Sequence, residues 1–163
     1  MPSSIAHGER AQAMAKALTN NTHVTAVDLS HCCFGDDGVE AICASLPSQT
    51  RILRLRDNNI TDRATEGICQ ALRSCPRLQS LDLSENEITD KGAKNIAAGA
   101  KFARSLESLN LSENDELTEK GGDAVVKGCS GCPQLRHLDL GETVVVKNMG
   151  DNGGTAAETL LSH

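Results

Sequence analysis

The stretch LQSLDLSENEITDKG, residues 78–92, decides the fold because close copies of it recur along the chain. The other copies are VTAVDLSHCCFGDDG from Val24, LRLRDNNITDRA from Leu53, LESLNLSENDELTEKG from Leu106 and LRHLDLGETVV from Leu135. Successive copies are 26, 28, 28 and 29 residues apart, counted at one leucine of the motif: Leu29, Leu55, Leu83, Leu111 and Leu140. A nearly fixed period of this length is the signature of a repeat protein.

Each copy predicts a short strand, a loop and a helix. Leu81 and Leu83 flank Asp82, and this alternation is typical of a strand. After the turn at Asn86, apolar residues recur three and four positions apart, which indicates a helix. A helix that joins one strand to the next parallel strand builds a parallel sheet covered by helices. We therefore expect an α/β solenoid with five parallel strands on the concave face and helices on the convex face.

The polar residues of the motif have predicted structural roles. A turn asparagine can satisfy loop N–H and C=O groups that no strand partner reaches. The predicted ladder of such residues is Asn58, Asn86 and Asn114. The Thr before each helix is expected to cap the first amide groups, and the acidic residue after it lies favourably at the positive end of the helix. The acidic residues with this expected role are Asp37, Asp62, Asp90 and Glu119.

The whole chain, residues 1–163, is expected to form a single domain. Residues 1–23 would hold the helix of a leading half-repeat, residues 24–145 five repeats, and residues 146–163 a loop and a C-terminal capping helix from about Thr155 to Leu161. That helix would cover the free edge of the last strand. We expect a monomer in which this helix is docked on the sheet edge. If the helix leaves the edge, two such edges can pair into a weak dimer.

The composition excludes several classes of function. The chain has 22 acidic residues against 16 Lys and Arg, a net charge of −6, and two Phe with no Trp or Tyr. Nucleic-acid binding is disfavoured because there is neither a basic footprint nor a set of rings for base stacking. The sequence contains no apolar stretch near the roughly 20 residues of a membrane span, and its first residues do not resemble a secretory signal. We therefore expect a cytoplasmic protein that binds no membrane.

The sequence shows little chemistry of its own. The seven cysteines are expected to be reduced thiols that pack as small apolar side chains. Cys129 and Cys132 form the only CxxC pair, and a zinc site needs four converging ligands. The five histidines fall into no metal-ligand spacing and no nucleophile motif. We therefore predict that the protein is not an enzyme and binds no metal and no cofactor.

The motif LxxLxLxxN, followed by ITDxG and a helix, resembles the leucine-rich repeats. The period of about 28 residues is similar to that of the ribonuclease-inhibitor subclass. The segments CPRL at Cys75 and CPQL at Cys132 are similar to the cysteine-containing subclass of F-box substrate adaptors. The resemblance covers residues 24–145. It implies a solenoid that binds other proteins, as in innate-immune receptors, the activator of the Ran GTPase and the actin-capping tropomodulins.

The side chains between the core leucines are expected to face the concave side, and they supply the candidate partner-binding site. A central column crosses the strands and comprises Asp28, Arg54, Asp82, Asn110 and Asp139. An acidic rim follows where the strands enter their loops and comprises Asp57, Glu85, Glu113 and Glu142. Neighbouring strands lie about 4.8 Å apart, so this rim would be a line of like charge that suits a basic partner. The alternative interpretation is a rim that is only solvated.

We predict a non-catalytic interaction module that binds a partner protein or peptide on the concave face and the acidic rim. Two alternatives stay open. One is a regulatory protein of the GTPase-activator or tropomodulin-like cytoskeletal type, and the other is a fragment of a larger receptor or adaptor array. The fold alone does not decide among them, because one fold hosts many functions.

Overall fold

The computed structural model describes residues 3–141, 143–146 and 158–161, and it describes side chains for residues 7–141. The helices are α1 (Ser3–Thr19), α2 (Gly35–Ala44), η1 (Asp62–Ala64, a 3-10 turn), α3 (Thr65–Ser74), α4 (Asp90–Ala100) and α5 (Glu119–Cys129). The strands are β1 (Ala26–Asp28), β2 (Ile52–Arg54), β3 (Ser80–Asp82), β4 (Ser108–Asn110), β5 (His137–Asp139), β6 (Thr143–Val146) and β7 (Glu158–Leu161). None of the described helices combines the length and apolar character that a membrane crossing requires.

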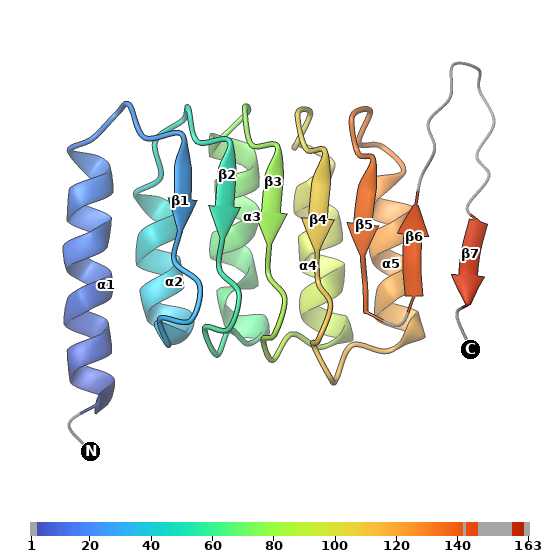
Figure 1. Cartoon of the computed structure of the whole chain (residues 1–163), viewed down its shortest axis with the longest axis horizontal. Coiled ribbons are helices and arrows are strands. Elements are labelled where there is room, and N and C mark those ends of the chain that lie inside the picture. The colour runs from blue at the N-terminus through green and yellow to red at the C-terminus, as the bar shows by residue number, and fades with distance from the viewer. Residues whose placement is uncertain (1–2, 142, 147–157, 162–163) are drawn as a thin grey trace.

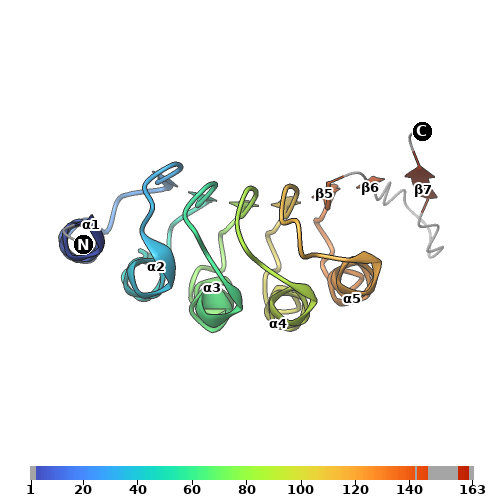
Figure 2. The ribbon, with the colours of Figure 1, turned by 90° about the horizontal axis from the view of Figure 1, so that it is seen from below.

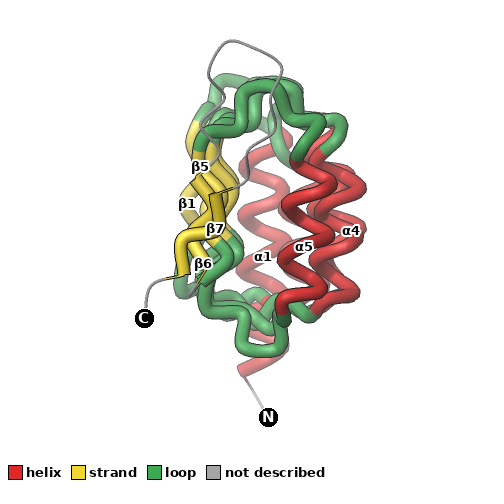
Figure 3. The backbone as a smooth tube through the Cα atoms, turned by 90° about the vertical axis from the view of Figure 1, so that its right-hand side faces the viewer, coloured by secondary structure: helices red, strands yellow, loops and turns green. Residues whose placement is uncertain are grey.

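The strands form one sheet in chain order, with a row of helices behind it (Figure 1). β1 to β5 are all parallel, and Leu81 of β3 lies opposite Leu53 on one side and Leu109 on the other. Seen from below, the strands line the inner side of a shallow arc and the helices its outer side (Figure 2). The end-on view shows the same two layers joined by loops (Figure 3). The predicted solenoid of five parallel strands is confirmed.

The core lies between the two layers and is aliphatic. Leu53, Leu81 and Leu109 form one column, and their exposed fractions are 0%, 1% and 0%. A second column is formed by Leu55, Leu83 and Leu111, each 0% exposed. Helices α2 to α5 close the core with aliphatic side chains that are 0% exposed, among them Ile42, Ile68, Ile96 and Val125. The leucine spacing of the sequence therefore translates directly into continuous apolar columns.

The asparagine ladder is confirmed as a structural device. The Oδ1 atom of Asn86 accepts hydrogen bonds from the backbone N–H groups of Asn58 and Ile60, each at 3.0 Å. Its Nδ2 atom donates at 3.0 Å to the carbonyl of Leu55 in the preceding repeat and to two carbonyls of its own repeat. Asn86 is 7% exposed, so these loop groups have little water to bond to instead.

A second ladder, here called the aspartate ladder, joins the starts of successive helices. The carboxylate of Asp62 accepts from the N–H and the hydroxyl of Thr89 at 2.9 and 2.8 Å, and from the N–H of Gly92 at 2.9 Å. A Cβ atom at position 92 would overlap this carboxylate, so the glycine is required for the close approach. The equivalent sets are Asp36 with Thr61, and Asp90 with Thr118 and Gly121.

The aspartate ladder corrects part of the sequence interpretation. The capping threonines are confirmed, since Thr61, Thr89 and Thr118 each accept from a backbone N–H two residues on. Asp62 and Asp90 lie in the first turn of their helices, as predicted, and they also bind the next repeat. In the first repeat this role falls to Asp36, whereas Asp37 is exposed and pairs with Arg63.

The prediction that the cysteines pack as small buried side chains is confirmed for five of the seven, whereas Cys33 is exposed and Cys32 is only partly buried. The buried ones are Cys43, Cys69, Cys75, Cys129 and Cys132. Burial raises the pKa of the Cys43 thiol to about 12, so this thiol stays protonated at neutral pH. The thiol of Cys75 donates to the carbonyl of Pro47 at 3.5 Å, and that of Cys132 donates to Ala100 at 3.1 Å. The two CPxL segments thus add contacts between repeats.

The C-terminal end differs from the expectation. The predicted capping helix from about Thr155 to Leu161 is wrong, because Glu158–Leu161 form strand β7. β6 pairs antiparallel with β5, and β7 pairs antiparallel with β6. The free edge of a sheet needs hydrogen-bond partners, which a strand supplies and a helix does not; β6 supplies them to β5 and β7 to β6. In addition, a helix shorter than about 12 residues is marginal in water. The run of β-branched residues Val144–Val146 also favours a strand. The intervening residues 147–157 lie outside the described residues.

Candidate functional site

The strand register places the central column side by side across the sheet. Asp28 lies opposite Arg54, Arg54 opposite Asp82, Asp82 opposite Asn110, and Asn110 opposite Asp139. Successive side chains of a strand point to opposite faces, and the leucines between these residues point into the core. The column therefore lies on the face away from the helices, as the sequence predicted.

The half of the concave face over β1 and β2 has most of its charges paired, Arg51 being the exception. Arg54 contacts the carboxylate of Asp28 at 3.2 Å, and Arg56 pairs with Glu85. The ring nitrogen Nδ1 of His31 lies 2.9 Å from a carboxylate oxygen of Asp57. Two of the predicted rim acids, Asp57 and Glu85, thus have a partner within the molecule. Exposed pairs of this kind add little stability, but the two arginines offset the carboxylate charge of this half.

The first carboxylate of the column has an electrostatic reason to stay ionised. The hydroxyl and the backbone N–H of Ser30 both donate to Asp28, at 2.8 and 3.2 Å. These bonds, with a smaller contribution from the Arg54 guanidinium, hold the pKa of Asp28 below its ordinary value. Asp28 is therefore an anion at neutral pH.

The half over β3 to β5 carries acidic side chains that, in the described part of the chain, are held by hydrogen bonds and not by ion pairs. The side-chain oxygen of Asp82 accepts from Ser84, that of Asn110 accepts from Ser112, and that of Asp139 accepts from the N–H of Gly141. Each of these bonds uses one oxygen and holds the side chain in place. Among the described residues, Asp82, Glu113 and Asp139 take part in no ion pair. The negative potential of the face is therefore concentrated on this half.

The rim residues share an uncommon backbone conformation. Asp57, Glu85 and Glu113 have φ angles of 50°, 54° and 55°, in the left-handed region that non-glycine residues seldom adopt. His31 occupies the equivalent place in the first repeat with φ 58°. The turn is stabilised by the buried asparagine that follows it, as Asn58 follows Asp57. The side chains on the rim are therefore set by the same turn in each repeat.

The rim brings three possible metal-ligating side chains together, although the sequence predicted no metal site. One ligand atom from each of His31, Asp57 and Glu85 lies within 4.8 Å of the others. His31 already bonds to Asp57, and Glu85 is bonded to the guanidinium of Arg56, a cation that competes for the same oxygens. The cluster is thus accounted for by one hydrogen bond and one ion pair.

The structure places eight of the nine predicted site residues on one continuous face and edge. The ninth, Glu142, lies outside the described residues. Sequence reasoning missed that Arg56 neutralises Glu85 in the next repeat. The signal was the repeat offset: Arg56 and Glu85 are 29 residues apart, about one repeat. The face offers fixed charges and hydrogen-bonding groups, which are features of a binding surface.

The chain is similar to known proteins in sequence motif and in fold. Three stretches, residues 20–43, 74–97 and 102–126, match the family model described as Leucine Rich repeat. No curated protein sequence matches the chain. One similar solved structure is the tropomodulin C-terminal domain from Caenorhabditis elegans, with a TM-score of 0.71 and 11% identity over 80% of this chain and 81% of that one.

A second similar structure is leiomodin-1 actin-binding site 2 (ABS2), with a TM-score of 0.70 and 18% identity. The likeness covers 82% of this chain and 78% of that one. Identities this low show a shared fold and nothing further. Assignment to the ribonuclease-inhibitor subclass stays a prediction. With its repeating parallel strands, its asparagine ladder and its three family matches, the chain contains leucine-rich repeats and folds as a leucine-rich-repeat solenoid.

Proposed function

We propose that this protein is a non-catalytic interaction module that binds a protein or peptide partner on its concave face and acidic rim. The partner-binding residues of this proposal are Asp28, Arg54, Asp57, Asp82, Glu85, Asn110, Glu113, Asp139 and Glu142. The observation that carries it is the unpaired acidic charge over β3 to β5, beside a half in which most of the charges are paired. A cytoplasmic location and a monomeric state belong to the same proposal.

The partner's chemistry follows from this charge distribution. Asp82 and Asp139 are held by local hydrogen bonds, so a cationic side chain meets carboxylates that are already oriented. Five strands span about 20 Å at the usual spacing, which is the width of a peptide, a helix or one lobe of a protein. The chain has no Trp or Tyr to act as binding hot spots. A basic segment bound largely through charge fits these properties.

A capture experiment with matched charge variants tests the proposal. The rim variant carries Glu85→Lys and Glu113→Lys, and the control variant carries Lys91→Glu and Lys120→Glu at exposed positions of α4 and α5. Proteins captured from cell extract by the wild type and the control, and lost by the rim variant, would support the proposal. Their capture should also weaken as salt is raised through about 0.1 to 0.5 M. Identical sets captured by all three proteins would refute it.

A second candidate is an actin-binding regulator, favoured by one specific observation. Both similar structures come from cytoskeletal proteins, and one of them is described as an actin-binding site. Co-sedimentation with actin filaments and a polymerisation assay with actin monomers test this candidate directly. Binding that the rim variant loses would make actin the partner of the concave face. Absence of binding to both forms would leave the general interaction module and exclude actin.

A further inference from the structure

At the N-terminal end the helix layer extends one element beyond the strand layer. α1 packs against α2, yet β1 is the first strand of the sheet (Figure 1). The other parallel strands, β2 to β5, each have a neighbour on both sides, since even the last of them, β5, is covered by β6. Among the described residues, no strand lies on the outer side of β1. One strand position facing α1 is therefore open.

The backbone of β1 presents hydrogen-bonding groups to this open position. The carbonyl of Thr25 and the N–H of Leu29 bond to the second repeat, to Ile52 and Arg54. In an extended strand, backbone groups alternate in direction, so those of Ala26 and Asp28 point away from β2. No described residue forms a strand pair with them on that side. An exposed row of this kind is a template for another strand.

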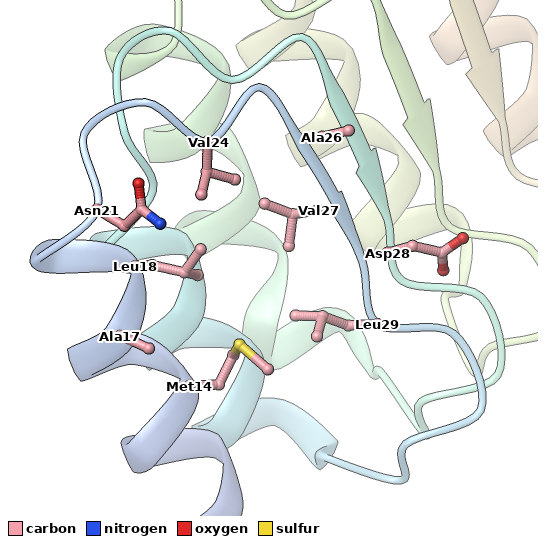
Figure 4. Close-up of a pocket in the computed structure, with 9 residues that line it drawn as sticks. All are labelled: Met14, Ala17, Leu18, Asn21, Val24, Ala26, Val27, Asp28 and Leu29. Carbon is pink, nitrogen blue, oxygen red and sulfur yellow. The ribbon is translucent and has the colours of Figure 1, made fainter.

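An apolar groove lies beside this edge. Met14 and Leu18 of α1 face Val24, Val27 and Leu29 across a space of about 270 Å³ (Figure 4). Met14 and Val24 are only partly buried, whereas Leu78 and Leu106, which hold the place of Val24 in later repeats, are 1% and 0% exposed. The two apolar columns of the core are thus less fully covered at this end. The groove lies where the inward side chains of one further strand would extend both columns.

We propose that this edge binds an extended segment of a partner protein, which adds to the sheet as a strand beside β1. The groove continues an interface that recurs between every pair of parallel strands in this molecule, so the same chemistry fits it. The segment carries aliphatic side chains at alternate positions, which enter the groove and extend the core columns. A basic residue between them faces Asp28, as Arg54 does from the other side. This site borders the concave face of the proposed function and shares Asp28 with it, but it includes none of the rim acids Asp57, Glu85 and Glu113.

The chain itself supplies the probe for a test. A capped synthetic peptide TRILRLR, residues 50–56, repeats the strand that pairs with β1 and contains the inward Leu53 and Leu55. Saturating peptide is expected to slow amide exchange at Ala26 and Asp28 by at least about tenfold, because both N–H groups become paired. A control peptide with Leu53→Ser and Leu55→Ser is expected to bind at least about tenfold more weakly. Equal affinity for both peptides, or binding without slower exchange at these two amides, would overturn the proposal.

Variants of the protein separate this edge from other surfaces. Ala26→Pro removes one outward N–H, and proline is tolerated on edge strands, whereas the control Ala26→Ser keeps the group. The proline variant is expected to lose peptide binding and the serine variant to retain it. The rim variant with Glu85→Lys and Glu113→Lys is expected to bind the peptide still, so failure here and failure of the proposed function are distinguishable. If sedimentation shows that the chain pairs with itself and protects the same amides, the occupant is a second copy and the partner assignment is wrong.

Discussion

The third repeat, around Leu83, and the first repeat, around Leu29, have the same backbone plan but differ in their bonds to neighbours. Asn86 bonds to the preceding repeat with both ends of its amide, whereas Cys32 holds the equivalent place in the first repeat and its thiol donates to Ser30 of its own repeat. Leu83 is 0% exposed and Leu29 is 5% exposed. Contacts between neighbouring repeats therefore supply much of the stability of each repeat, and a repeat is most stable where it has a neighbour on both sides.

The largest expected effect comes from shortening a leucine at the centre of the stack. Leu83→Ala should lower the free energy of unfolding by about 2–5 kcal/mol, because it removes transfer energy and leaves a cavity between two neighbours. Leu29→Ala should cost less, since the first repeat can relax on its open side. Urea unfolding of both variants measures the difference. Equal losses of unfolding free energy in the two variants would contradict the view that central repeats depend more on their neighbours than the first repeat does.

The asparagine ladder should show the same contrast. Asn86→Ala leaves buried N–H and C=O groups without partners and should cost about 1–3 kcal/mol, whereas Cys32→Ala should change stability by less than about 0.5 kcal/mol. The midpoint and slope of each urea unfolding curve give the free energy of unfolding of the two variants. A small effect at Asn86 would show that water replaces the ladder.

The aspartate ladder predicts coupling between two repeats. Asp62→Ala should cost about 1–3 kcal/mol, and Gly92→Ala a similar amount because its Cβ displaces the same carboxylate. The double variant should then cost less than the sum of the two. Gly8→Ala in α1 is the control, since a Cβ there meets no atom within 4 Å. Strict additivity would mean that the two residues act independently.

The smallest expected effect is on the acid dependence of stability. Hydrogen bonds from the hydroxyl and N–H of Thr118 hold the pKa of Asp90 below 3.8 in the folded protein. Because the folded pKa is lower than the unfolded one, the ionised carboxylate favours folding at neutral pH, and this contribution is lost as pH falls below about 4. Asp90→Asn should therefore lose less stability than the wild type between about pH 5 and pH 3. Asp123→Asn, at an exposed place on α5, should behave as the wild type.

The parts of the fold that repeat could be predicted from the sequence. Leu55, Leu83 and Leu111 recur at one spacing, and the same spacing identifies Asn58, Asn86 and Asn114, so strand positions and both structural roles follow from periodicity alone. Periodicity ends near Val145, and β7 could not be predicted because its residues pair with a strand that has no copy elsewhere in the chain. A seven-residue stretch with four apolar side chains, as in residues 155–161, is compatible with a helix or a strand, and pairing with the edge of β6 decides for the strand.

The candidate site could be predicted in position but not in charge balance. The alternation of leucines identifies which residues face the concave side, as the register confirms for Asp82 and Asn110. It does not say which long side chains reach across a repeat, so the pairing of Arg56 with Glu85 appeared only in three dimensions. The role of Asp62 was missed for a related reason, because an aspartate after a capping threonine already has a local explanation.

The central claim is that a partner binds the concave face, with the acidic half over β3 to β5 contributing most. A hydrogen-exchange footprint of the complex with a captured partner tests it most directly. We expect slower exchange in residues 80–85, 108–113 and 137–139, with α3, α4 and α5 unchanged on the convex side. A footprint confined to the helices, with no change in those strand segments, would contradict it.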